Sequence, residues 1–440
     1  MAQKQRLKCD DLIVGAGMQG IMATRACVSQ GRDCIVVEKG PGVGGILQPV
    51  VLNGIPVDSG CHIWGAREHV NIEFIETEVG IEMIPVHGHC EISASTDGVL
   101  RRRLAVPSFE SLPEEWRIEA IGHARAMDPG ILASEPIGVS MPRAFGRRVS
   151  DEILAMARRL YGRDPGDLTI DAAAQMALCR MKLHTCDELR ARSTDAPDLG
   201  PLLCSHPLDG KDDSLVKYRY PQGGLHRFVD GCLSWMEANT RDLALSASPR
   251  SLEATPGRAG GTLELKDRTI DYQRLLWCCN PLALGTLVDL PLPEKQATAG
   301  SPFRLFVFVI QDDHCQVEYS HDFRLDSPMF RSWIPPVEMA VGEPGSRYVI
   351  VECPGAGNDP GTIASVGRHA AAFHGLDHEA LDYLGTRAQV RFFPTMAYVN
   401  WLKELSRAVD VYEQSIVVPD KPLYGKDVIT EWWTRAIGAL

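Results

Sequence analysis

Three glycines and one glutamate near the start of the chain have the spacing of a dinucleotide-binding turn. Gly15, Gly17, Gly20 and Glu38 lie within a segment, 11–38, that reads as strand, glycine turn, helix and second strand. Gly15 permits the tight turn, Gly17 lets the backbone approach a pyrophosphate, and Gly20 lets helix and strand pack closely. The unpaired N–H groups at the start of the helix can bind the phosphates. Glu38 can accept hydrogen bonds from a ribose diol and would repel a 2′-phosphate, so the segment predicts an adenine dinucleotide other than NADP.

A second group of glycines follows this acid directly. Residues 40–45 contain four glycines, and residues 58–64 read Asp-Ser-Gly-Cys-His-Ile-Trp. A nicotinamide dehydrogenase usually continues here into a third strand–helix unit. Extra glycines suit FAD instead, because its extended form brings the backbone close to the ribityl chain and the ring. The pattern resembles the FAD family with the glutathione-reductase type of nucleotide site, in the branch of amine oxidases, protoporphyrinogen oxidases, phytoene desaturases and UDP-galactopyranose mutases.

Three later segments extend this resemblance from residue 11 to residue 440. Residues 145–168, followed by Arg180, resemble the helical passage of that branch. Residues 218–226 (Tyr-Arg-Tyr-Pro-Gln-Gly-Gly-Leu-His) resemble its Tyr-Pro-x-Gly-Gly turn, which introduces a helix beside the flavin ring. Residues 424–428 (Tyr-Gly-Lys-Asp-Val) resemble its C-terminal glycine-acid element, whose helix begins facing the flavin. This last match is the loosest, because it keeps only one glycine and one acid.

The resemblance implies a set of cofactor-binding residues, with FAD as the cofactor. The set comprises Gly15, Gly17, Gly20, Glu38, Lys39, Gly44, Gly45, Gly60, Leu252, Gly425, Asp427 and Val428. The resemblance also implies that the backbone near Leu252 touches the adenine. Asn280-Pro281, which are outside this set, are expected to close over the pyrophosphate region.

Residues expected around the flavin ring are the candidates for catalysis, because a flavin carries the redox chemistry itself and no catalytic triad is legible. His62 can act as a base or hydrogen-bond donor near neutral pH. The candidate catalytic residues are His62, Tyr220 and Arg331. The candidate substrate-binding residues are Tyr218, Arg219, His226, Arg391 and Phe393. If several of the arginines converge in the cleft, we infer an anionic substrate, such as a carboxylate or a phosphate.

The leading functional hypothesis is an FAD-dependent oxidoreductase that moves a hydride from a small organic substrate to the flavin, with oxygen or another acceptor as oxidant. Two alternatives stay open: a flavin-dependent sugar mutase resembling UDP-galactopyranose mutase, and a non-catalytic flavoprotein that binds a partner. An amine oxidase in the strict sense is disfavoured. Ile46 stands where many of those enzymes carry an arginine, and Trp432-Trp433 do not match their aromatic pair.

Composition excludes several other classes of protein. The chain of 440 residues is 45% hydrophobic and 23% charged, with a formal net charge of −12, which argues against a nucleic-acid partner. No apolar run approaches the roughly 18 residues of a membrane span, and residues 1–10 do not resemble a signal peptide. The 13 cysteines show no C-x-x-C and no metal-ligand spacing. We therefore expect a cytoplasmic protein without a transmembrane segment or a metal site.

The expected fold class is α/β, with a Rossmann-like FAD-binding domain interleaved with an α+β substrate domain. Strands are expected at 243–246, 262–265, 275–278, 303–310, 317–320 and 347–353, a loop at 354–361 and a helix at 399–413. The expected division is an FAD-binding part at 1–104, a helical substrate part at 105–242, a second FAD-binding part at 243–299, a strand-rich substrate part at 300–414 and a flavin-contacting segment at 415–440.

Overall fold

A computed structural model describes most of the chain. The described residues are 5–65, 68–86, 92–99, 107–127, 129–178, 181–183, 218–310, 318–338, 345–412, 415–423 and 425–438. Arg180, Val317, Tyr424 and residues 184–217, which the sequence expectations include, lie outside this part.

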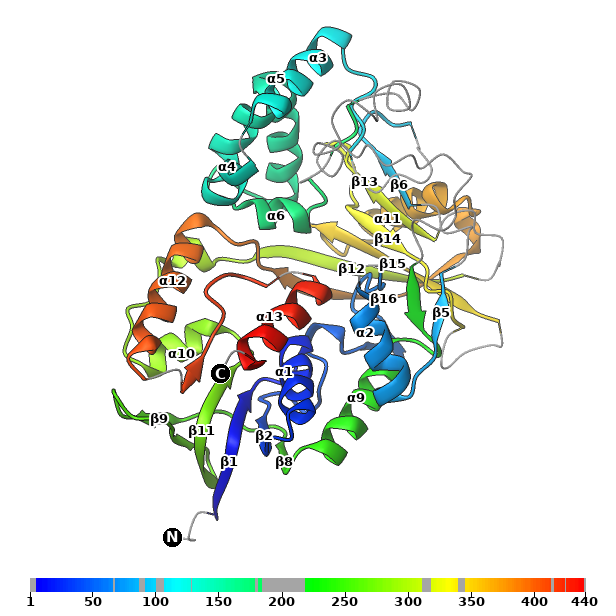
Figure 1. Ribbon diagram of the computed structural model, residues 1–440. Coiled ribbons are helices and arrows are strands. Elements are labelled where there is room, and N and C mark those ends of the chain that lie inside the picture. Colours follow the sequence, from blue (N-terminus) through cyan, green and yellow to red (C-terminus); the bar gives the residue numbers. More distant parts are fainter. Residues whose placement is uncertain are drawn as a thin grey trace.

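The first sheet gathers strands from distant parts of the chain (Figure 1). Its order is β8-β2-β1-β11-β10-β9, and β17 pairs with β11. The strands are β1 (Gln5–Val14), β2 (Cys34–Val37), β8 (Asp242–Ala244), β9 (Ser251–Ala254), β10 (Gly261–Glu264), β11 (Arg268–Trp277) and β17 (Ile416–Val417). β1 is parallel to both β2 and β11, whereas β10 runs antiparallel to β11 and β9.

Both faces of this sheet are covered by helices, as expected around parallel strands whose paired segments, such as 12–14, 34–37 and 275–277, are apolar. On one face, Ile13 and Leu276 join a core with α1 (Met18–Ser29), α9 (Leu225–Asn239) and α13 (Lys426–Gly438). On the other face, Leu12 and Leu275 pack with α10 (Pro281–Leu287) and α12 (Met396–Asp410). Figure 1 shows α13, in red, lying across α1, in blue.

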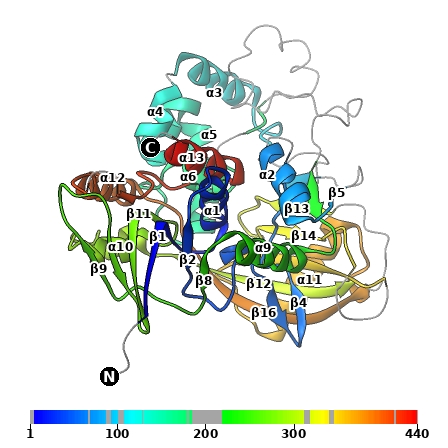
Figure 2. The ribbon, with the colours of Figure 1, turned by 60° about the horizontal axis from the view of Figure 1, so that its bottom comes forward.

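A second, six-stranded sheet has the order β16-β12-β15-β14-β13-β6. Its strands are β6 (Ile92–Ser95), β12 (Ser301–Ile310), β13 (Tyr319–Asp322), β14 (Arg331–Trp333), β15 (Arg347–Pro354) and β16 (Leu381–Arg391). One face packs on α11 (Pro360–His374) through Phe306, Val349 and Val351. The opposite face shares the core of α1 and α9, and Figure 2 shows α9 running between the two sheets.

Alternation along β15 decides which of its side chains face the first sheet. Val349 and Val351 point toward α11, so Tyr348, Ile350 and Glu352 point the other way. A carboxylate in an otherwise apolar strand is thereby placed on the face between the two sheets.

The remaining elements form a helical lobe and small connecting pieces. The lobe comprises α3 (Glu114–Ala126), α4 (Pro129–Ser134), α5 (Ile137–Tyr161) and α6 (Ile170–Gln175). The connecting pieces are β3 (Val50–Leu52), β4 (Ile55–Val57), α2 (His69–Phe74), β5 (Met83–Pro85) and β7 (Arg219–Pro221). Residues of α3, α5 and α6 share one core with Phe303, Phe330 and Phe393.

The expected fold class is confirmed: a Rossmann-like sheet is interleaved with a mixed helical and stranded part. The helix expected at 399–413 is α12, which packs on the first sheet although it lies within the 300–414 segment. The domain limits stay a prediction. Sequence patterns did not indicate α11 or β16.

Among the described residues, no helix has the length and apolar character needed to cross a bilayer. Asp11, Cys27 and Cys34 offer ligand atoms within 4.8 Å of one another. Asp11 is already engaged, however, because its carboxylate accepts hydrogen bonds from Arg32 and Arg274. The arrangement is therefore that of a buried ion-pair cluster that anchors β1.

Candidate functional site

The turn between β1 and α1 has the geometry that its glycines predict. Gly15 has a φ of +104°, and a Cβ atom there would lie 2.9 Å from Cys279 Cβ. At Gly20 a Cβ atom would lie only 1.8 Å from the Gly15 carbonyl oxygen. Helix and strand therefore approach each other more closely than any other residue permits.

The second glycine group folds directly onto this turn. The Gly44 N–H donates to the Ala16 carbonyl at 2.8 Å, and Gly17 and Gly44 form an isolated bridge. A Cβ atom on Gly45 would lie 3.0 Å from Gly17 Cα, and both Gly44 and Gly45 have positive φ. The two groups, separated by more than twenty residues in the sequence, thus form one backbone-lined surface.

Glu38 lies at the edge of this surface. Its carboxylate accepts hydrogen bonds from the Ala16 N–H at 2.7 Å and from the Gly40 N–H at 2.6 Å, while the neighbouring Lys39 is exposed. Helix α1 begins after Gly17 without a side-chain cap. Its first N–H groups are therefore available to an anion, and the residues present suit the pyrophosphate and ribose of an adenine dinucleotide.

Beyond the glycines, a buried carboxylate gathers two arginines from neighbouring strands. Glu352 Oε2 lies 2.7 Å from Arg331 Nε and also pairs with Arg391. Burial alone would raise the pKa of Glu352, but the two guanidinium groups lower it to about 2. Burial lowers the pKa of Arg391 to about 10. The cluster carries one more positive than negative charge, because two arginines share one glutamate.

Gly60, Cys61 and His62 lie against this cluster. Gly60 has a φ of +150°, and a Cβ atom there would lie 2.8 Å from Glu352 Oε1. The Cys61 N–H donates to the same oxygen at 3.4 Å. Burial and the positive charges of Lys426 and Arg331 lower the pKa of His62 to about 3. His62 is therefore neutral at physiological pH and keeps a ring nitrogen that can accept a proton.

Tyr220 reaches this region through a buried acid. Its hydroxyl donates to Asp58, and its ring packs against Trp333. Burial raises the pKa of Asp58 to about 6, although hydrogen bonds from Tyr220 and Tyr348 act in the opposite direction. Asp58 begins the stretch that carries Gly60 and His62. The hydrogen bond from Tyr220 therefore helps to fix the position of that stretch.

The other predicted residues are more dispersed. Arg219 pairs with Trp64 in a backbone bridge, and its guanidinium donates to the Met83 carbonyl at 3.0 Å. The Tyr218 ring lies beside Gly65, and His226 lies in the first turn of α9.

Phe393 and Leu252 each pack in an apolar core. Phe393 is buried against Tyr161 and Phe303 in the core of the helical lobe. Leu252 lies on β9, three strands from β1. Gly425, Asp427 and Val428 lie at the start of α13. Their predicted contacts with substrate and cofactor stay predictions.

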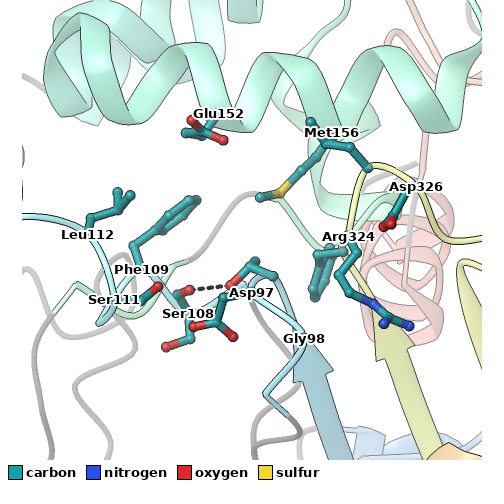
Figure 3. A pocket seen from close by; sticks show the side chains of 13 residues that line it. Asp97, Gly98, Ser108, Phe109, Ser111, Leu112, Glu152, Met156, Arg324 and Asp326 are labelled. Carbon is teal, nitrogen blue, oxygen red and sulfur yellow. Dashed lines mark hydrogen bonds between the residues drawn. The ribbon is translucent and has the colours of Figure 1, made fainter.

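A cavity of about 500 Å³ opens between the helical lobe and the end of the second sheet. Figure 3 shows Glu152 and Met156 of α5 on one side and Phe109 and Asp97 on the other. Phe323 lines it and stacks on His321, with ring centroids 5.4 Å apart. The Tyr319 hydroxyl lies 3.2 Å from His321 Nε2, and Tyr319 is electrostatically coupled to Arg331. A row of aromatic side chains therefore runs from the cavity to the Glu352 cluster.

Comparison with known proteins gives one matching family model and several solved structures with a similar fold. A family model for an NAD(P)-binding Rossmann-like domain matches residues 13–73. A search of curated protein sequences found no match. Among solved structures, wild-type putrescine oxidase with bound putrescine aligns over 99% of both chains, with a TM-score of 0.66 at 13% identity.

Two further solved structures align with similar scores. Reduced UDP-galactopyranose mutase gives a TM-score of 0.68 at 13% identity, over 98% of this chain and 94% of that chain. Cyclohexylamine oxidase from Brevibacterium oxydans gives 0.62 at 14% identity, over 98% of both chains. The chain has the amine oxidase fold. The resemblance inferred from the glycine turns is thereby confirmed at the level of fold.

Within the amine oxidase fold of this chain, five polar residues near the Glu352 cluster or His62 were not indicated as site residues by sequence: the buried Asp58, Tyr319, His321 and Glu352, and the half-buried Lys426. Glu352 had a usable signal, since it is the single acid in an apolar strand. Lys426 had one as well, because it lies inside the C-terminal element. For Tyr319 and His321 no local signal exists, because only the sheet brings them close to Arg331.

His321 makes a testable contribution to acid sensitivity. Burial and the Arg331 charge lower its pKa to about 3, so its contribution to stability is complete above the ordinary value near 6.5 and is lost as pH falls. His62 acts in the same direction, whereas Asp58, with its raised pKa, opposes both. Between pH 4 and 6, His321→Gln should lower the slope of unfolding free energy against pH by about 1.4 kcal/mol per unit. Urea unfolding at several pH values measures this, and identical slopes for the two proteins would contradict it.

Proposed function

We propose that the protein is an FAD-dependent oxidoreductase that moves a hydride from a small organic substrate to the flavin. The observation that carries the proposal is the joined surface of the two glycine groups. It presents the uncapped start of α1 and the Glu38 carboxylate within the amine oxidase fold. Lys39, Gly425, Asp427 and Val428 are proposed as further cofactor contacts.

Cofactor binding and substrate orientation are assigned to different groups of residues. The N–H groups at the start of α1 bind the pyrophosphate, and Glu38 accepts hydrogen bonds from the ribose. When bound, FAD supplies the hydride acceptor, and oxygen or another oxidant regenerates it. His62, which is neutral near pH 7, accepts a hydrogen bond from the substrate. Arg331 and Arg391 orient a substrate that carries a negative charge.

A sugar mutase of the UDP-galactopyranose mutase type is the second candidate. The convergence of two buried arginines on one glutamate beside His62 favours it, because the excess positive charge suits an anionic substrate. The likeness to reduced UDP-galactopyranose mutase is as strong as that to the oxidases.

An absorbance spectrum of purified protein mixed with FAD tests the property that both candidates require, which is binding of FAD. We expect a yellow complex with resolved flavin bands after removal of free FAD. Under anaerobic conditions, amines, cyclic alkenes and sugar nucleotides are then added in turn. Bleaching by a substrate alone identifies an oxidoreductase, and turnover only after reduction by dithionite identifies a mutase. A yellow complex that no compound reduces or converts identifies a binding protein, and a colourless protein contradicts the proposal.

A further inference from the structure

The stretch of residues 58–65 carries Gly60 and His62 past the Glu352 cluster without regular secondary structure. We call it the 58–65 segment. Its first end is fixed by Asp58, which accepts a hydrogen bond from Tyr220 of β7. At its far end, Trp64 forms a backbone bridge with Arg219, also of β7. Two anchors therefore come from one short strand, and a third comes from a distant part of the chain.

The third anchor is Lys426, the first residue of α13. Its Nζ donates to the Ile63 carbonyl at 2.6 Å and lies 4.3 Å from the centroid of the Trp64 ring. It also lies 3.6 Å from Glu68 Oε1, while Glu68 Oε2 accepts the Gly65 N–H at 2.6 Å. Among the described residues, the ammonium group therefore contacts Ile63 and Trp64 of the 58–65 segment and Glu68 shortly after it.

The position of this lysine is unfavourable by itself. Cations are disfavoured at helix N-termini because the helix dipole is positive there, and burial lowers the pKa of Lys426 further. Lower on α13, the Thr430 hydroxyl donates to Asn71 Oδ1 at 2.5 Å, which ties the helix to α2. The start of α13 is therefore joined to Ile63 through Lys426 and to α2 through Thr430.

We propose that Lys426 is a positioning residue that holds the 58–65 segment, and with it His62, in place from the last helix of the chain. The proposal goes beyond the proposed function and rests on it only for the hydrogen bond that His62 makes to the substrate. It implies that the C-terminal helix controls the candidate active site without contributing a reacting group.

Charge gives this proposal a signature that loss of structure alone would not produce. Four charged groups face His62: Lys426 from α13, Arg331 from β14, Glu352 from β15 and Arg391 from β16. Burial and the Lys426 charge are the two largest influences that keep His62 neutral. Replacement of Lys426 by an uncharged residue should therefore raise the pKa of His62.

Four variants separate position from charge. Lys426→Met keeps an unbranched side chain that is one atom shorter and removes the hydrogen bond and the charge, whereas Lys426→Arg keeps a positive charge and hydrogen-bond donors. Arg435→Met removes an exposed cation from the other end of α13 and serves as the matched control. The double variant Glu68→Gln/Lys426→Met also removes the carboxylate that the single change leaves without its cation.

The pKa of His62 is followed by NMR in protein whose histidine rings carry ¹⁵N, with His62→Gln to assign the signal. In Lys426→Met we expect a rise of about one pH unit, and in Lys426→Arg and Arg435→Met the wild-type value. FAD affinity, measured by titration of flavin fluorescence, should fall about tenfold in Lys426→Met, equivalent to loss of one good contact. The double variant should regain stability toward urea but retain the raised His62 pKa and the weakened FAD binding.

Failure of the two proposals can be told apart. If the wild-type protein takes up no FAD, the proposed function is contradicted, while the His62 pKa and urea unfolding still test Lys426. If Lys426→Met matches Arg435→Met in both His62 pKa and FAD affinity, the positioning role is contradicted. If Lys426→Met proves too unstable to measure, the double variant provides the same readouts, and wild-type values in it overturn the proposal.

Discussion

Gly20→Ala is expected to abolish FAD uptake and to destabilise the protein by several kcal/mol. The added Cβ atom would lie 1.8 Å from the Gly15 carbonyl oxygen and 2.8 Å from the Gly15 carbonyl carbon. Both are backbone atoms, so the clash is relieved only if α1 moves away from β1. Overpacking typically costs about 1–3 kcal/mol when side chains can adjust, and more when they cannot. FAD titration and urea unfolding measure the two effects.

A second glycine-to-alanine change provides the control. Gly122 lies within α3, has no neighbouring atom within 4 Å of an added Cβ, and has no positive φ. Gly122→Ala should stabilise the protein by up to about 1 kcal/mol, because alanine favours helix, and should leave FAD uptake intact. Normal FAD binding by Gly20→Ala would show that the glycine turn is not the nucleotide site.

Glu352→Gln is expected to cost roughly 3–5 kcal/mol, since removal of one partner from a buried ion pair leaves uncompensated charge. Glu352 is 1% exposed and is the shared partner of Arg331 and Arg391. The amide keeps the shape of the side chain but leaves two buried guanidinium groups that repel each other. Its carboxylate also accepts the Cys61 N–H, so the change reaches the stretch that carries His62. Urea unfolding near pH 7 measures the loss.

Two comparisons show whether the loss comes from unbalanced charge. Glu352→Gln combined with Arg331→Met removes one positive charge as well and should recover part of the stability. Glu135→Gln breaks an exposed ion pair with Arg143, whose atoms lie 2.6 Å apart, and should cost no more than about 1 kcal/mol. A loss for Glu352→Gln as small as that for Glu135→Gln would mean that water already screens the cluster.

The nucleotide-binding turn was predictable because its determinants are contiguous. Gly15, Gly17 and Gly20 constrain one another through backbone contacts within a few residues, and Glu38 ends the next strand. Such a unit has the same geometry wherever the rest of the chain goes. The interleaved fold was expected from the resemblance together with the strands indicated at 243–246, 262–265 and 275–278, which correspond to β8, β10 and β11.

The Glu352 cluster was only half predictable, because it is assembled by pairing between strands far apart in sequence. Arg331 and Arg391 were indicated as neighbours of the cleft. The carboxylate that joins them was not, since its orientation depends on the alternation of β15 within the completed sheet. Phe393 is buried against Tyr161 and Phe303, and its contact with a substrate stays a prediction.

β16 and α11 are among the elements that were not predicted, and they were missed for opposite reasons. β16 lies at an edge of its sheet and is largely exposed, so it lacks the apolar pattern by which strands are recognised. α11 carries a clear start signal that was interpreted as a loop. Asp359 caps the helix by accepting the Thr362 N–H at 3.0 Å, and Pro360 occupies its first turn. Aspartate followed by proline marks the start of a helix as readily as it marks a turn.

The order of strands in the first sheet has a consequence for the protein's synthesis on the ribosome. β1 pairs from Gln5↔Arg268 to Val14↔Trp277, and the sheet gains its last strand only at Ile416. The amino-terminal strand β1 therefore emerges shortly before β2 but long before its other partner, β11, is translated. Pairing across such separations slows folding, and exposed apolar strands promote aggregation in the meantime. We expect the nascent chain to depend on chaperones until its final residues have left the exit tunnel.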